Sequence, residues 1–238
     1  MFQSINFQHM NSKIKLFFSC SCLFFISVAQ DKEIKTLTTS PFTGIKVFSE
    51  IKLTLIHSDV NKAIVSGPQS DDVTLSMRNG ILQIKIALGS YSDSIPTKID
   101  LYHSKLLNKI SALQGAQVIS REPIRQTSLN LESKTGGEID IEVYADRLDA
   151  VANTGGRLAM KGVVSNLNLK VNIGGSCEAE QLQTSQTQVK LLGGGYAYLL
   201  ATKLLEAKVV GGSVLRVFGK PEKVVYERKL SGKIFFEE

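Results

Sequence analysis

Four carboxylates in the middle of the sequence have the spacing of a candidate site. Asp140 and Glu142 lie two residues apart in one alternating stretch, and Glu178 and Glu180 lie two residues apart in another. If these stretches are strands two rungs apart in one sheet, the pairs are separated by about 9–10 Å. That separation is at the edge of the range for the carboxylates of an inverting glycosidase, so the pattern allows sugar hydrolysis as one interpretation.

A lysine between the two pairs favours the other interpretation, which is structural. Lys161 falls between Glu142 and Glu180 in one column when the repeats described below are aligned. Alternating charge is how a solvated sheet face avoids like-charge neighbours. We therefore predict no catalytic residue, and we keep as candidate binding residues the outward carboxylates Asp140, Glu142, Glu178 and Glu180.

The histidines and the cysteine beyond the first 30 residues give no further reactive site. His57 and His103 have no Cys, Asp or second His at ligand spacing, which predicts surface or turn histidines. Cys177 falls in an inward column and is predicted to be a small core residue, since a nucleophile needs exposure and a base. Zinc spacing, phosphate-binding loops and nucleophile elbows are absent, so we predict no metal, no cofactor and no enzyme activity.

Glycine pairs recur at a nearly constant interval through the second half of the chain. The intervals are 18 to 20 residues, and Ser231-Gly232 closes the series. A fixed short period is the signature of a solenoid. The pairs lie at 136–137, 155–156, 174–175, 193–194 and 211–212.

Each glycine pair precedes a stretch of alternating apolar and polar residues, and a second such stretch follows before the next pair. Alternation predicts half-buried strands, and about 19 residues hold two strands and two turns with no helix. The fold class is therefore all-β, a parallel β-helix or β-solenoid with coils of about 19 residues. Aligning the repeats predicts two inward columns: Ile139, Leu158, Cys177, Tyr196 and Val214, then Ile141, Met160, Ala179, Tyr198 and Arg216.

Residues 30–112 are rich in predicted strands but show no repeat. Arg78-Asn79-Gly80 between two alternating stretches predicts a hairpin. This part is either a cap or a set of irregular early coils. We expect it to form one continuous domain with the repeats of residues 113–238.

The first 29 residues have the order of a secretory signal peptide. Lys13 and Lys15 precede a short apolar run, and Ser27-Val28-Ala29 supplies the small residues before a cut at Gln30. Met10 fits as a start as well as Met1. No later segment has the apolar length of a membrane helix. We expect an exported protein that is periplasmic, associated with the outer membrane or secreted.

Several motifs together resemble a known family. Phe42-Thr43-Gly44-Ile45-Lys46-Val47 is followed by the Asn-Gly-Ile-Leu hairpin at 79–82, by the glycine pairs and by Gly219-Lys220-Pro221. Over residues 38–236 the chain resembles the auto-transporter adhesin family with the head GIN domain. Members usually show Ser-Gly-Ser-Gly where this chain has Thr-Gly-Gly, so it is a divergent copy. The resemblance implies a parallel β-helix-like fold, export and no assigned activity.

Three functions remain open on these grounds. The first is a non-enzymatic, adhesin-like binding or scaffold protein of the cell envelope or surface, with an unknown envelope protein or glycan as partner. The second is a carbohydrate-active β-helix enzyme, and the third is a periplasmic partner of a sensory or anti-sigma system. The chain has 28 Lys and Arg against 22 Asp and Glu, scattered singly, so we expect no nucleic-acid partner. We expect a monomer or a weak homo-oligomer.

Overall fold

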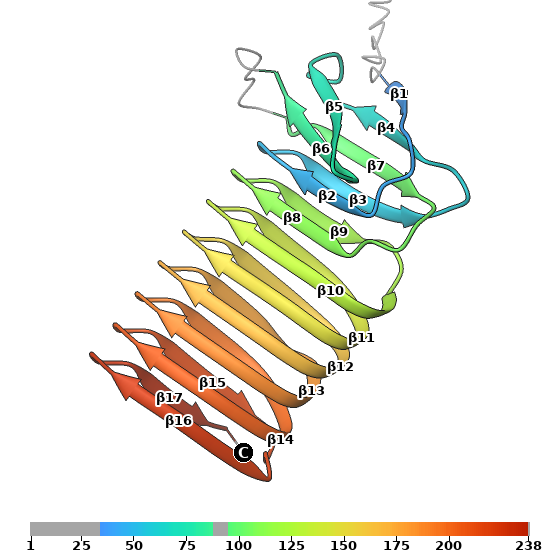
Figure 1. Cartoon of the computed structure of the whole chain (residues 1–238). Helices are drawn as coiled ribbons and strands as arrows, with labels where there is room; N and C mark the ends of the chain where they lie inside the picture. The colour runs from blue at the N-terminus through green and yellow to red at the C-terminus, as the bar shows by residue number, and fades with distance from the viewer. Residues whose placement is uncertain (1–33, 88–94, 238) are drawn as a thin grey trace, which may run out of the picture. The chain divides into compact units, whose positions relative to one another are not determined.

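The computed structural model describes residues 34–87 and 95–237. The predicted signal peptide and its cut at Gln30 lie outside the described residues. Within them every regular element is a β-strand, and the strands join in one hydrogen-bonded sheet. The sheet winds into a solenoid with coils of about 19 residues (Figure 1), which confirms the predicted fold class.

Five long strands form the regular part of the solenoid. Each pairs in parallel with the next along the chain, and Glu138 lies beside Arg157, which lies beside Ser176, so one coil takes 19 residues here. Figure 1 shows them stacked in chain order. They are β10 (Ile124–Lys134), β11 (Glu138–Asn153), β12 (Arg157–Asn172), β13 (Ser176–Leu192) and β14 (Tyr196–Val210).

Each long strand bends once and contributes to two faces. In β11 the buried positions are Ile139 and Ile141 before the bend but Leu148 and Ala150 after it, so the inward parity changes at 145–147. We call the half before the bend the first face and the half after it the second face. The last coils continue both faces with β15 (Val214–Phe218), β16 (Lys223–Lys229) and β17 (Lys233–Phe236).

The glycine pairs form the corners between coils, and in the pairs at 136–137, 155–156 and 174–175 the two glycines have different roles. At one corner Thr154 and Gly155 both have positive φ, 51° and 70°, and the Gly156 amide donates to the Asn153 carbonyl at 3.0 Å. This is a type I′ turn. A Cβ on Gly155 would meet nothing within 4 Å, whereas one on Gly156 would lie 2.3 Å from the Ser133 carbonyl oxygen. The first glycine supplies the turn conformation, and the second allows adjacent coils to pack.

The inward columns confirm the repeat alignment up to the third glycine of the Gly193–Gly195 run and correct it afterwards. Ile139, Leu158 and Cys177 are register neighbours and fully buried. The next members are Ala197 and Leu215. The prediction of Tyr196, Val214, Tyr198 and Arg216 was wrong by one residue, because a bulge in β13 adds a residue before this corner and Gly194-Gly195, rather than Gly193-Gly194, corresponds to Gly174-Gly175.

The N-terminal part forms coils whose order in space differs from their order in the chain. On one face β2 pairs with β6 and β8, and on the other β3 pairs with β7 and β9, so the β2–β3 coil is inserted between two later coils. The predicted hairpin is confirmed, with Asn79 and Gly80 at φ 51° and 74° between β5 and β6. The strands are β1 (Ile34–Thr38), β2 (Gly44–Val47), β3 (Lys52–His57), β4 (Lys62–Ser66), β5 (Val73–Arg78), β6 (Ile81–Ile86), β7 (Lys98–His103), β8 (Lys109–Leu113) and β9 (Gln117–Ser120).

Candidate ligand-binding face

The predicted carboxylate Glu142 lies on the first face in a small charged network. Its Oε1 accepts a hydrogen bond from the Tyr144 hydroxyl at 2.9 Å, and its Oε2 lies 3.4 Å from the Lys161 ammonium. The Tyr144 hydrogen bond and the Lys161 charge lower the pKa of Glu142. The Arg125 guanidinium stacks 3.8 Å from the centre of the Tyr144 ring. Glu142 is therefore an ionised, paired surface group and not a proton donor at neutral pH.

The other three carboxylates do not converge with Glu142. Glu178 accepts from Arg157 Nε at 3.1 Å and from Nη2 at 2.5 Å, a bidentate pair that raises the pKa of Arg157. Asp140 and Glu178 are register positions two coils apart, with Ala159 between them.

The predicted Glu-Lys-Glu column is wrong at its last member. A bulge in β13 places Gln181 beside Lys161, and Glu180 lies exposed at that bulge. The four carboxylates thus lie along one face, where Glu142 and Glu178 are each held by a cation.

The two histidines lie side by side, which the sequence did not indicate. His57 and His103 are register partners in β3 and β7, with ring centres 5.6 Å apart. Burial lowers the pKa of His103, although its Nδ1 lies 2.9 Å from the Lys105 carbonyl oxygen. With Glu122 and Leu106 they line a pocket of about 320 Å³. The out-of-order β3–β7 pairing joins them, and no local pattern reports it.

Cys177 lies in the core as the sequence predicts. Its side chain is fully buried, and burial raises the pKa of its thiol. A buried protonated thiol is neither a nucleophile nor a metal ligand.

A larger polar array lies on the second face, where the sequence analysis named no site residue. Asn130, Asp149, Asn168, Gln188 and Glu206 are successive register neighbours on five strands. We call this set the amide column. Asn168 Nδ2 donates to Asp149 Oδ1 at 2.9 Å, and Gln188 Nε2 donates to Glu206 Oε2 at 3.3 Å.

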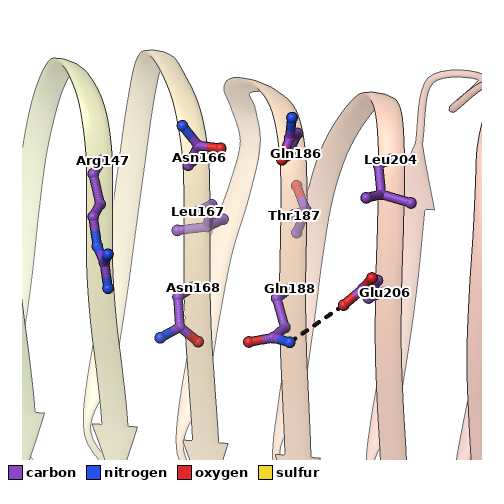
Figure 2. Close-up of a pocket in the computed structure, with 9 residues that line it drawn as sticks. All are labelled: Arg147, Asn166, Leu167, Asn168, Gln186, Thr187, Gln188, Leu204 and Glu206. Carbon is purple, nitrogen blue, oxygen red and sulfur yellow. Dashed lines mark hydrogen bonds between the residues drawn. The ribbon is translucent and has the colours of Figure 1, made fainter.

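The amide column borders a hollow of about 330 Å³. Figure 2 shows Arg147, Asn166 and Gln186 above and Asn168, Gln188 and Glu206 below, with Leu167 and Thr187 between them. Arg147 holds Asp149 through hydrogen bonds of 2.7 and 3.2 Å, which lower the pKa of Asp149. The hollow therefore presents amide donors and acceptors beside fixed charges.

A column of lysines runs beside the amide column. Lys170, Lys190 and Lys208 are register neighbours on β12, β13 and β14. We call this set the lysine column. A second hollow of about 350 Å³ is lined by Gln188, Lys190, Glu206 and Lys208 among others, so the two hollows share residues of the amide column. The second stretch of each repeat carries these residues, but Lys170 and Lys190 are 20 residues apart and Lys190 and Lys208 are 18 apart, so the register of the strands is needed to place them in one column.

Two kinds of feature are absent from the described residues. No group of three or more His, Cys, Asp or Glu side chains is placed to hold a metal ion. No helix of those residues is long and apolar enough to cross a membrane.

Comparison with known structures finds the same fold in proteins with low sequence identity. A "putative adhesin" of Bacteroides fragilis matches with a TM-score of 0.80 and 19% identity, over 88% of this chain and 98% of that one. A "putative adhesin" of Parabacteroides merdae matches with a TM-score of 0.68, 18% identity and the same coverages. A "putative lipid binding protein" of Parabacteroides distasonis matches at 0.67 and 17%, over 88% of this chain and 98% of that one.

The sequence itself matches one family model. The match covers residues 41–221, which is most of the chain, and no curated protein sequence matches it. The glycine corners and the Asn-Gly hairpin that suggested this relation lie within the matched range. This chain therefore belongs to the family described as "Putative auto-transporter adhesin, head GIN domain".

Proposed function

We propose that this protein is an exported, non-enzymatic binding module of the cell envelope or surface, and that its ligand lies across the second face of the solenoid. The observation that carries the proposal is the amide column, a series of exposed and half-buried hydrogen-bonding side chains that continues over five strands beside two hollows with shared lining residues. Such a surface can bind an extended ligand through many weak hydrogen bonds. The adhesin family of the chain supports this class of function.

The charge arrangement supports binding over catalysis. General acid–base chemistry on a sugar needs two carboxyl groups on either side of one bond, one of them with a raised pKa. On the first face Glu142 and Glu178 are instead held by Lys161 and Arg157. We propose Asp140, Glu142, Glu178 and Glu180 as a secondary contact set.

Ligand screening on an array tests this proposal. The purified chain is applied to neutral and acidic glycans and to vesicles of phosphatidylethanolamine and phosphatidylglycerol, since one similar structure is named a lipid-binding protein. We expect glycan binding that falls when Asn168→Ala and Gln188→Ala are combined. Asp140→Asn with Glu180→Gln on the first face is the matched control and should have a smaller effect. Equal loss from both pairs, or binding to vesicles alone, would overturn the assignment of the second face.

Export is tested separately. We propose that residues 1–29 are removed and that the remaining chain acts as one continuous domain. N-terminal sequencing of protein from the envelope fraction should begin at Gln30 or a close neighbour. Mature protein that retains Met1 or Met10 would contradict export by this signal.

A further inference from the structure

The lysine column places like charges next to each other on adjacent strands. Several other cations lie beside acids, as in the 3.0 Å pair of Lys109 and Glu132. In the lysine column three cations follow one another on adjacent strands. Lys208 is paired with Glu227 at 3.1 Å, whereas Lys170 and Lys190 form no ion pair within the described part of the chain.

Stacked like charges are unfavourable in a sheet unless something neutralises them. Neighbouring strands are about 4.8 Å apart, and like charges directly opposite each other destabilise a strand pair. The side chains of Lys170 and Lys190 are exposed, so a ligand can reach both ammonium groups. A polymer with negative charges repeated along its length meets this requirement when it runs parallel to the solenoid axis, across the strands.

The neighbouring amide column indicates which other functional groups such a polymer should carry. Amide side chains offer a donor and an acceptor in one group, and carboxylates accept from hydroxyls. Asn168 and Gln188 lie two positions before Lys170 and Lys190 in their strands, so they project from the same side of the sheet. Asp149 and Glu206, in the same column, accept hydrogen bonds from hydroxyls and would repel a phosphate that reached them. The surface therefore suits a chain with hydroxyl groups along the side that faces the amide column and acidic groups along the side that faces the lysine column.

We propose that the second face binds an acidic polysaccharide, with its carboxylate or sulfate groups on the lysine column and its hydroxyls on the amide column. This inference rests on the proposed function, because it names the ligand class of the same face. The chain offers a matched control elsewhere. Lys52 and Lys98 are also exposed register partners, but they form a stack of two in the N-terminal coils.

The test measures binding of polygalacturonate, neutral dextran and single-stranded DNA by calorimetry at two salt concentrations. We expect polygalacturonate to bind best and to be weakened by salt. Lys170→Gln with Lys190→Gln should weaken it by about tenfold or more, because two charge-assisted contacts are lost. Lys52→Gln with Lys98→Gln removes the same charge and should leave affinity within about twofold. Circular dichroism and melting curves confirm that both variants fold.

Other results would contradict either the acidic ligand or the second face as its binding site. Equal weakening by both lysine pairs would mean nonspecific attraction by net charge. Tighter binding of DNA than of polygalacturonate would mean the wrong polymer class. If polygalacturonate does not bind while a neutral glycan does, and that binding depends on Asn168 and Gln188, the acidic ligand is wrong but the binding face stands. If no glycan depends on these amides, the proposed function fails as well.

Discussion

The regular coils and the N-terminal coils of this solenoid are built from the same sheet contacts but in different chain order. From β10 to β14 each strand pairs with the next one along the chain. In the N-terminal part β2 lies between β6 and β8. Registers in the regular coils therefore follow from the period of the sequence, whereas those of the N-terminal coils depend on contacts between distant segments.

The two regions also differ in how their corners are made. The hairpin of the N-terminal part uses Asn79 and Gly80 for its two positive φ angles, and a regular corner uses Ile173 and Gly174. Asn enters this conformation readily and a β-branched residue does not. The regular corners accept such strain because each one stacks on the next, as when the Thr154 amide donates to the Asn172 carbonyl of the following coil at 3.2 Å.

The largest expected effect comes from a charge in an inward column of the regular coils. Leu158 is fully buried between Ile139 and Cys177. Leu158→Asp places an unpaired carboxylate there and should lower the free energy of unfolding by about 4 kcal/mol or more. Lys161→Gln on the outward side of the same strand should cost less than about 1 kcal/mol. Urea melts compare them, and equal shifts would contradict the assignment of inward and outward sides.

A somewhat smaller effect should separate the two glycines of one corner. Gly156→Ala puts a methyl group 2.3 Å from the Ser133 carbonyl oxygen, so adjacent coils must move apart. Gly155→Ala meets no atom and costs only the left-handed backbone conformation, about 1 kcal/mol. We expect the Gly156→Ala variant to be less stable than the Gly155→Ala variant by about 1 kcal/mol or more. Thermal and urea unfolding should both show this difference. Equal destabilisation would mean that the coils can separate freely at this corner.

Most of the regular solenoid could be predicted from the sequence, because alternation and the glycine period specify faces and registers locally. The prediction first failed after the bulge in β13, which adds one residue to that coil and moves Ala197 into the column assigned to Tyr196. Local patterns cannot reveal that β2 and β3 are inserted between later coils, which is why the contact of His57 with His103 was missed.

The candidate site was predicted less well than the fold. Reasoning from catalytic chemistry drew attention to the four carboxylates of the first face, since paired acids carry known reactions. A binding surface has no such sequence motif. It is recognised here because Asn168 and Gln188 share one column and Lys170 and Lys190 share the next. That relation depends on register across the bulge in β13, which only the structure gives.

A pH-dependent prediction tests the junction of the two regions. Burial raises the pKa of Glu132 on β10, but hydrogen bonds from Lys134 and from Lys109 on β8 outweigh it and bring the pKa from 4.5 to about 2. The pKa of Glu132 is lower in the folded chain than in the unfolded chain, so ionised Glu132 stabilises the fold. This stabilisation is fully present above pH 4.5 and is lost as the pH falls towards 2.

Replacing this carboxylate should remove that pH dependence. Glu132→Gln should cost about 1–2 kcal/mol at pH 6 and little at pH 2.5, measured by urea unfolding across that range. The control is Glu227→Gln, which removes a carboxylate that is 41% exposed and held by Lys208 and Lys229 in the last coils, away from the junction. An identical pH profile for the parent and Glu132→Gln would mean that this ion pair does not couple β8 to β10.

The smallest effect should come from moving the turn residue of the N-terminal hairpin into a regular corner. Ile173 has φ 50° and is 63% exposed, so its side chain loses little packing on replacement. Ile173→Asn makes the corner Asn-Gly-Gly, with the residue that Asn79 supplies at φ 51°. We expect stabilisation of about 0.5–1 kcal/mol, because Asn adopts this conformation with less strain. Ile173→Val keeps the β-branch and should gain nothing. If both variants gain equally in melting temperature, the benefit comes from removing exposed apolar surface rather than from relieving the backbone.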